Sequence, residues 1–127
     1  MDRTVITSKH APAVIGPYSQ AIKAGPFVFT SGQIPIDPAT GRLVEGDITA
    51  QIRCVMLNLQ TVLEAAGLTF ADVLKSTIFV KDLGQFSTIN QVYGEFFPSN
   101  PPARSTVQVA KLPLDAAVEI ELVAYAG

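Results

Sequence analysis

One long amphipathic helix constrains the fold of this chain more than any other feature. Between residues 48 and 66, apolar side chains recur at the spacing of a single helical face: Ile48, Ile52, Val55, Met56, Leu59, Val62, Leu63 and Ala66. Asp47 is suited to cap the N-terminus of this helix, and Gly67 is suited to stop it. The helix therefore has one core-facing side, which has to be buried against another layer.

Segments rich in β-branched residues supply that second layer. We expect strands at 4–8, 19–25, 27–35, 73–81, 103–110 and 116–126. Gly25-Pro26 suits a hairpin turn, 36–43 suits a tight turn, and a second helix is predicted over 86–97, before Pro98. The order β-β-β-α-β-α-β-β predicts one α+β domain, residues 1–127, with a mainly antiparallel sheet and both helices on one face.

The composition predicts that the open face of this sheet is covered. Only 16% of the residues are charged, against roughly 25% in an average soluble domain, and 48% are hydrophobic. No run approaches the ~18 apolar residues of a spanning helix, so we expect no membrane insertion. The start of the chain has no apolar signal segment, which favours the cytoplasm. Along 118–125, Glu119 and Glu121 share a side with Val123 and Tyr125, a mixed surface that suits an oligomer interface.

Several function classes are disfavoured by the sequence. Cys54 is the single cysteine and His10 the single histidine, so an internal disulfide and a multi-cysteine metal site are excluded. No phosphate-binding or dinucleotide-binding glycine motif is present. The net charge is −2 and the basic residues are scattered, which makes a nucleic-acid partner unlikely.

One arginine stands out in an otherwise uncharged stretch. Arg104 opens the strand-like run in PPARSTVQVA, residues 101–110, and shares one side of it with Thr106 and Gln108. Glu119 lies on the following strand, which we expect to pair beside this one. Arg104 and Glu119 then form either a structural ion pair or an anion-binding site with a carboxylate acid/base. The residues alone leave both interpretations open.

Four blocks of sequence carry a resemblance to a known family. IGPYSQA (15–21), SGQIPIDPATG (31–41), PPARSTVQVAKLP (101–113) and VEIELVA (118–124) resemble, in order and spacing, the RidA family, also called the YjgF or reactive-intermediate imine deaminase family. The resemblance runs from about residue 4 to the end.

The resemblance implies an assembly and a reaction. Members of this family are homotrimers with a chorismate-mutase-like α+β fold and clefts between subunits. They are hydrolases acting on C=N bonds: they convert 2-imino acids and their enamine tautomers, such as 2-aminoacrylate, to 2-oxo acids and ammonia. No cofactor and no metal is implied. The expected small-molecule substrates escape from pyridoxal-phosphate enzymes, including serine and threonine dehydratases.

The resemblance also implies roles for particular residues. The carboxylate-binding arginine falls on Arg104 and the glutamate associated with the attacking water on Glu119. Substrate-binding positions fall on the following residues: Tyr18, Ser31, Gly32, Asn90 and Thr106. Many members carry cysteine where this chain has Thr106, which puts any thiol-dependent behaviour in doubt and leaves a role for the backbone of that residue.

Two alternatives remain beside the deaminase. The first is a trimer that binds small carboxylates and acts on a partner enzyme without turnover, since fold does not fix function. The second is ribonuclease activity or inhibition of translation, also attributed to family members, which the acidic composition disfavours.

Overall fold

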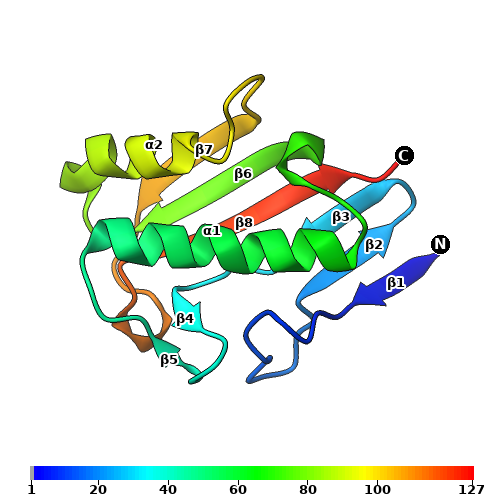
Figure 1. Ribbon diagram of the computed structural model, residues 1–127, viewed down its shortest axis with the longest axis horizontal. Coiled ribbons are helices and arrows are strands. Elements are labelled where there is room, and N and C mark those ends of the chain that lie inside the picture. The colour runs from blue at the N-terminus through cyan, green and yellow to red at the C-terminus, as the bar shows by residue number, and fades with distance from the viewer. Residues whose placement is uncertain (1) are drawn as a thin grey trace.

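The computed structural model describes residues 2–127 and shows a helix layer packed on a sheet (Figure 1). Six strands form the main sheet in the order β1-β2-β3-β8-β6-β7. Their bounds are Arg3–Ile6, Ala21–Ala24, Phe27–Thr30, Val118–Tyr125, Val73–Val80 and Ala103–Gln108. Short strands β4 (Ile36–Asp37) and β5 (Arg42–Leu43) pair separately, around the turn predicted there. The predicted α+β class and element order are confirmed.

Helix α1 (Ile48–Ala65) forms as the sequence predicts. The Asp47 side chain accepts a hydrogen bond from the Ala50 N–H at 3.1 Å, which satisfies one of the donors left open at a helix start. Past the C-terminus, Gly67 adopts a φ of +76°, a conformation that glycine tolerates best. Local residue chemistry therefore fixes both ends of this helix.

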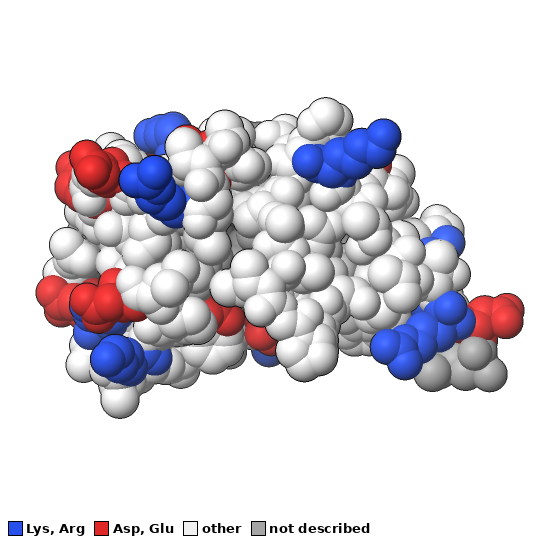
Figure 2. Space-filling view, turned by 90° about the horizontal axis from the view of Figure 1, so that it is seen from below, with Lys and Arg blue, Asp and Glu red and all other residues white. Residues whose placement is uncertain are grey.

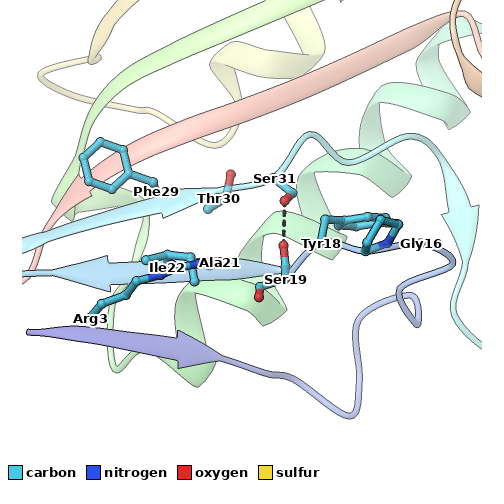
Figure 3. A pocket seen from close by; sticks show the side chains of 10 residues that line it. Arg3, Gly16, Tyr18, Ser19, Ala21, Ile22, Phe29, Thr30 and Ser31 are labelled. Atoms are coloured by element: carbon cyan, nitrogen blue, oxygen red, sulfur yellow. Dashed lines mark hydrogen bonds between the residues drawn. The ribbon is translucent and has the colours of Figure 1, made fainter.

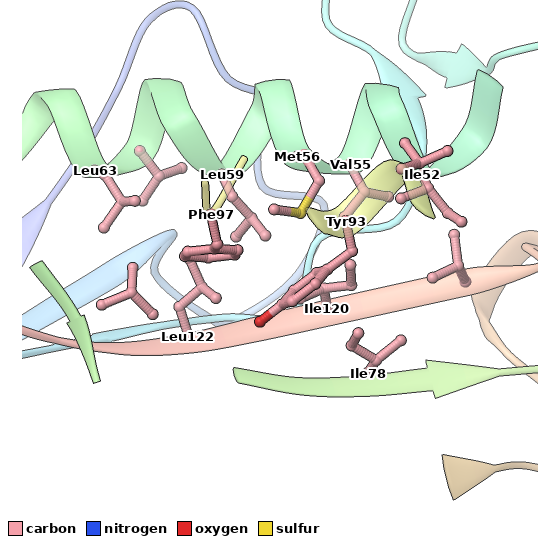
Figure 4. Close-up of a cluster of buried hydrophobic side chains, with 14 of the residues drawn as sticks. Ile52, Val55, Met56, Leu59, Leu63, Ile78, Tyr93, Phe97, Ile120 and Leu122 are labelled. Carbon is pink, nitrogen blue, oxygen red and sulfur yellow. The ribbon is translucent and has the colours of Figure 1, made fainter. Parts of the chain in front are cut away.

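The core lies between α1 and the central strands β8 and β6. From α1, Ile52, Val55, Met56, Leu59 and Leu63 are buried with at most a trace of exposure. Ile78 of β6 and the β8 residues Ile120 and Leu122 meet them from the sheet (Figure 4). The predicted inward side of 118–124 is confirmed, and the β8 glutamates point to the opposite face.

Helix α2 (Phe86–Gly94) is shorter than predicted. After Gly94 the chain continues in tighter turns, with N–H groups of residues 95–97 bonding carbonyls three residues back. Ile89, Val92 and Tyr93 are buried on its inner side, whereas Phe86 remains 41% exposed. The helix lies beside α1 on the same face of the sheet, as predicted (Figure 1).

The predicted pairing of residues 103–110 with 116–126 is wrong. Strand β7 pairs in parallel with β6, and β8 pairs antiparallel with β6 from the other side. Strands β6 and β7 are joined through α2, and two parallel strands require such a crossover. Because β6 separates them, Arg104 of β7 and Glu119 of β8 are not on neighbouring strands.

The face of the sheet opposite the helices exposes apolar side chains. Five large ones are between 39% and 56% exposed: Val5, Phe27, Phe29, Val107 and Tyr125. The register places them on the same face as Glu119, since Phe79 pairs with both Val107 and Glu119. We call this surface the open face. In residues 2–127, none of the helices has the length and apolar character needed to cross a membrane.

Candidate functional site

Glu119 is one of the residues that line a pocket of about 320 Å³. Tyr18, Ser31, Gly32 and Glu119 all line it, so the structure brings four of the predicted site residues together. They come from the loop before β2, the segment after β3 and the start of β8. We call this cavity the Glu119 pocket.

A backbone bridge brings Gly32 to Glu119. The Gln33 N–H donates to the Ile120 carbonyl at 2.9 Å, and the Ile120 N–H donates back to the Gln33 carbonyl at 3.1 Å. A methyl group built on Gly32 would lie only 2.7 Å from Cδ of Glu119, well inside van der Waals contact. The carboxyl therefore rests against bare backbone, and a side chain at position 32 would displace it.

Ser31 and Tyr18 form the wall that this pocket shares with a neighbouring hollow (Figure 3). The Ser31 hydroxyl donates to the Ser19 carbonyl at 2.6 Å, and the Ser31 N–H donates to the Gln20 carbonyl at 2.9 Å. Tyr18 follows the Gly16-Pro17 turn and is 48% exposed. Ser31 is thus fixed by the fold, while Tyr18 stands at the rim.

The environment of Glu119 favours its protonated form. Desolvation in the pocket raises the pKa of Glu119 above its ordinary value, and the negative charge of Glu121 raises it further. Two ion pairs occur within residues 2–127, Arg53 with Glu95 and Lys81 with Asp115, and neither includes Glu119. This half-buried carboxyl therefore retains a proton to a higher pH than an ordinary glutamate, a property suited to a group that accepts and returns protons.

Arg104 lies on the other side of the sheet. Its register partner is Ser76, whose buried side chain faces α2, so Arg104 also points toward the helix layer. The guanidinium carbon lies 5.1 Å from the centre of the Tyr93 ring and 5.5 Å from that of Phe86. Both distances are typical of cation–π contacts. We call Arg104 and these two rings the Arg104 platform.

The platform holds Arg104 without neutralising it. Neither ion pair in the described part of the chain involves this guanidinium. The ring contacts take up none of its hydrogen-bond donors, and a guanidinium with available N–H groups can bind a carboxylate with two parallel hydrogen bonds. The structural ion pair between Arg104 and Glu119 is absent within one chain.

Asn90 and Thr106 contribute two buried oxygen atoms that lack a partner. Asn90 belongs to α2, and Thr106 is on β7, two residues after Arg104 and on the same side of the strand. Among residues 2–127, Asn90 Oδ1 and Thr106 Oγ1 are the buried side-chain oxygens or nitrogens without a hydrogen-bond partner. Such atoms are costly unless something else binds them. Strand β7 is also the sheet edge, so part of its backbone lacks a strand partner.

The predicted site residues therefore divide into two groups. Tyr18, Ser31, Gly32 and Glu119 line one pocket, whereas Arg104 and Thr106 lie on the opposite side of the sheet, with Asn90 on α2. The sequence did not single out Tyr93, Phe86 or Ser76 as neighbours of Arg104. Ser76 did offer a signal, because it shares one side of its strand with the apolar Ile78 and Val80 and is fully buried. Within residues 2–127, no three histidine, cysteine or carboxylate side chains converge as metal ligands.

Comparisons with known proteins agree over nearly the whole chain. A family model described as Endoribonuclease L-PSP matches residues 8–126. A 2-iminobutanoate/2-iminopropanoate deaminase of Salmonella typhimurium is 49% identical over 127 residues, covering 98% of each chain. The crystal structure of Escherichia coli TdcF with bound serine matches with a TM-score of 0.93 at 44% identity, covering 98% of this chain and 99% of that one.

A further crystal structure carries the name that the sequence blocks suggested. RidA from an Antarctic Psychrobacter matches with a TM-score of 0.92 at 42% identity, covering 96% of this chain and 98% of that one. The agreement extends over the blocks that supply both residue groups. The chain therefore belongs to the Endoribonuclease L-PSP family, of which the RidA proteins are members.

Proposed function

We propose that this protein is a 2-iminobutanoate/2-iminopropanoate deaminase, which hydrolyses reactive 2-imino acids and their enamine tautomers, such as 2-aminoacrylate, to 2-oxo acids and ammonia. One observation carries the proposal: Arg104 is presented with its donors uncommitted, and Glu119 is a proton-retaining carboxyl in a separate pocket. The printed name of the Salmonella relative supports the same reaction.

The complete site is formed between two copies of the chain. Arg104, Asn90 and Thr106 come from one subunit, and Tyr18, Ser31, Gly32 and Glu119 from its neighbour. The sheet between the two groups supports this arrangement, because it prevents both from reaching one small molecule within a single chain. The apolar open face supports the association, since exposed apolar patches mark interfaces. The assembly is a cytoplasmic homotrimer with a chorismate-mutase-like fold.

The first steps place the substrate. Arg104 receives the carboxylate through two charge-assisted hydrogen bonds, which are stronger in an enclosed cleft than in water. The Gly32 N–H assists, since no side chain obstructs its backbone. An enamine is first converted to its imine tautomer, whose carbon is electrophilic. The cleft then has to supply orientation rather than strong activation.

Hydrolysis proceeds by addition of water and loss of ammonia. The Glu119 carboxylate and the backbone carbonyl of Thr106 hold the water against the imine carbon. As the C–O bond forms, the water gives a proton to Glu119. Glu119 returns that proton to the nitrogen, which gives a carbinolamine. Glu119 then carries the remaining hydroxyl proton to the nitrogen as the C–N bond breaks, so that ammonia leaves and the oxygen becomes the carbonyl of the 2-oxo acid. Burial supports this role, because it brings the carboxyl closer to the range where it accepts and returns a proton.

A binding protein without turnover is the second candidate. TdcF was crystallised with bound serine, a small amino acid whose carboxylate suits the same guanidinium. An RNA-directed function has less support. On the face in Figure 2, the lysine and arginine side chains are separated and interspersed with acidic ones, and the net charge is −2. RNA binding normally uses a continuous basic surface.

The reaction is tested by generating 2-aminoacrylate in place with a serine dehydratase and following pyruvate formation. The wild-type protein is expected to shorten the lag, and Arg104→Ala is expected not to. If the wild type leaves the lag unchanged while 2-oxobutyrate still raises its unfolding temperature, the chain is a binding protein and the deaminase proposal is wrong.

A further inference from the structure

A buried pair of hydroxyl groups lies beneath Arg104 and has no role in the reaction described above. Ser76 is fully buried and Tyr93 is 5% exposed. Their oxygens are 2.6 Å apart, a short hydrogen bond inside the core. The bond joins β6 to α2. A phenylalanine would fill the same space without a polar atom to satisfy, so the hydroxyl requires a physical explanation.

The hydroxyl pair lies at the same level of the sheet as Arg104. Ser76 is the direct register partner of Arg104 in the parallel β6–β7 ladder. On the helix side of the sheet, the centre of the Tyr93 ring lies 5.1 Å from the Arg104 guanidinium carbon. The tip of that ring is bonded to Ser76, and its side packs on Phe97 with 4.8 Å between ring centres. Ser76, Tyr93 and Arg104 thus form a closed triangle across three elements.

The hydrogen bond fixes the ring that supports the guanidinium. A free arginine side chain samples many rotamers, and a binding site needs its groups within roughly 0.5 Å of the productive place. A carboxylate partner would order Arg104 but would also occupy its donors. A neutral ring orders it and leaves the donors to a ligand. Burial raises the pKa of Tyr93, so the phenol stays protonated and the ring neutral at working pH.

We propose that the Ser76–Tyr93 hydroxyl pair is a positioning device for Arg104. It holds the Tyr93 ring so that the guanidinium faces the cleft in a fixed orientation, ready for a carboxylate. Neither residue touches the substrate. The inference rests on the proposed function of Arg104 and extends it to two residues of the core.

The test uses Tyr93→Phe, Ser76→Ala and the double variant in the assembled protein. Thr61→Val is the control, since it removes a hydroxyl that bonds only to a carbonyl of its own helix, away from both residue groups. We expect KM and the Kd for 2-oxobutyrate to rise about 3- to 10-fold in each single variant, with kcat within about twofold, because a binding contact is weakened equally in ground and transition states. The double variant should raise KM and Kd no further than the single variants do, since each substitution removes the same hydrogen bond.

A second ligand separates positioning from general loosening. The primary amide of 2-oxobutyrate lacks the charge that Arg104 recognises, so its affinity should change less than that of the acid. Equal losses for acid and amide, or a fall in kcat alone, would mean a merely structural role and overturn the proposal. KM and Kd values in Tyr93→Phe and Ser76→Ala that match those of Thr61→Val would overturn it as well.

Arg104→Ala distinguishes the two levels of the argument. If it abolishes 2-oxobutyrate binding while Tyr93→Phe changes nothing, the carboxylate site stands and the positioning device fails. If Arg104→Ala leaves binding unchanged, the carboxylate site itself is wrong, and the positioning proposal falls with it.

Discussion

The Arg104 platform and the Glu119 pocket handle charge in opposite ways. Arg104 is ordered by the faces of two aromatic rings, so its cation is held but not neutralised. Glu119 is set against the bare backbone of Gly32, in a pocket where burial disfavours its anion. One group is prepared to bind a negative charge, and the other is prepared to exchange a proton.

The comparison shows why the two groups are not beside each other in the chain. Two adjacent opposite charges would pair, which would occupy the donors of Arg104 and lower the pKa of Glu119. Their placement on opposite sides of the sheet keeps both properties in the single chain, and in the site proposed here a neighbouring subunit would bring the two groups together. Removing either group should therefore have a distinct kinetic signature.

Replacing the cation should have the largest effect. Arg104→Ala removes two charge-assisted hydrogen bonds to the carboxylate, and we expect kcat/KM to fall about 10²- to 10³-fold. Steady-state kinetics on in-situ imine and calorimetry with 2-oxobutyrate measure the loss. Arg42→Ala, an exposed arginine of β5, is the control and should match wild type. A similar loss of kcat/KM in both variants would mean that the Arg104 platform has no specific role in binding the substrate.

Replacing the acid should affect the chemical step. Glu119→Gln keeps the size of the side chain but cannot exchange a proton, so kcat should fall about 10²-fold or more while 2-oxobutyrate binding persists. Glu64→Gln, exposed on α1, is the control. An unchanged kcat in Glu119→Gln would refute the assigned role.

The same variant should be more stable at neutral pH. Because burial raises the pKa of Glu119 in the folded state, the fold is disfavoured by the ionised carboxylate as pH rises through that raised pKa. An amide has no such cost. Thermal unfolding should therefore occur at higher temperature for Glu119→Gln at pH 7, and the difference should vanish in acid. A lower unfolding temperature at pH 7 would contradict the electrostatic account.

Crowding Glu119 should have a smaller effect than removing it. Gly32→Ala places a methyl group against the carboxyl, which is the end of a flexible side chain and moves away. We expect kcat to fall about tenfold with little loss of stability, since a misplaced group loses its geometry and not its chemistry. Gly94→Ala meets nothing within 4 Å and is the control. Full activity of Gly32→Ala would show that the contact is dispensable.

The smallest expected effect concerns the neighbour of Glu119. Glu121→Gln removes a negative charge that raises the pKa of Glu119. The rise of kcat/KM with pH, which follows formation of the Glu119 carboxylate, should move toward lower pH. Profiles of wild type, Glu121→Gln and Glu119→Gln measure it, and the transition should be missing from the last. A shift toward higher pH would mean that another group titrates.

The sequence predicts local structure better than strand neighbours. The prediction of helix α1 was correct because each of its signals is local. Asp47, Gly67 and the apolar stripe each act on residues only a few positions away in the chain. The predicted partner of β7 was wrong because the short connection at 111–116 does not oblige the two strands that it joins to pair. The segments 73–81, 86–97 and 103–110 did contain the signal of a β-α-β unit, which places β7 parallel to β6.

The sequence proposed residues for the candidate site but did not predict how they are arranged. Strand periodicity put Arg104 and Thr106 on one side, and the structure agrees. That Glu119 faces away from them depends on β6 lying between, which is a non-local fact. The Tyr93 and Phe86 rings around Arg104 also depend on how α2 crosses the sheet. Sequence spacing carries no direct record of either arrangement.

Mixing two inactive variants tests the central claim most directly. Arg104→Ala keeps an intact Glu119 pocket, and Glu119→Gln keeps an intact Arg104 platform. If each site joins two subunits, random co-assembly of equal amounts restores one intact platform–pocket pair in about one quarter of the sites of a closed ring. We predict that co-expressed protein regains about a quarter of wild-type kcat per site, while the separately purified variants remain inactive. No recovery in verified mixed oligomers would mean that Arg104 and Glu119 do not act across a subunit boundary.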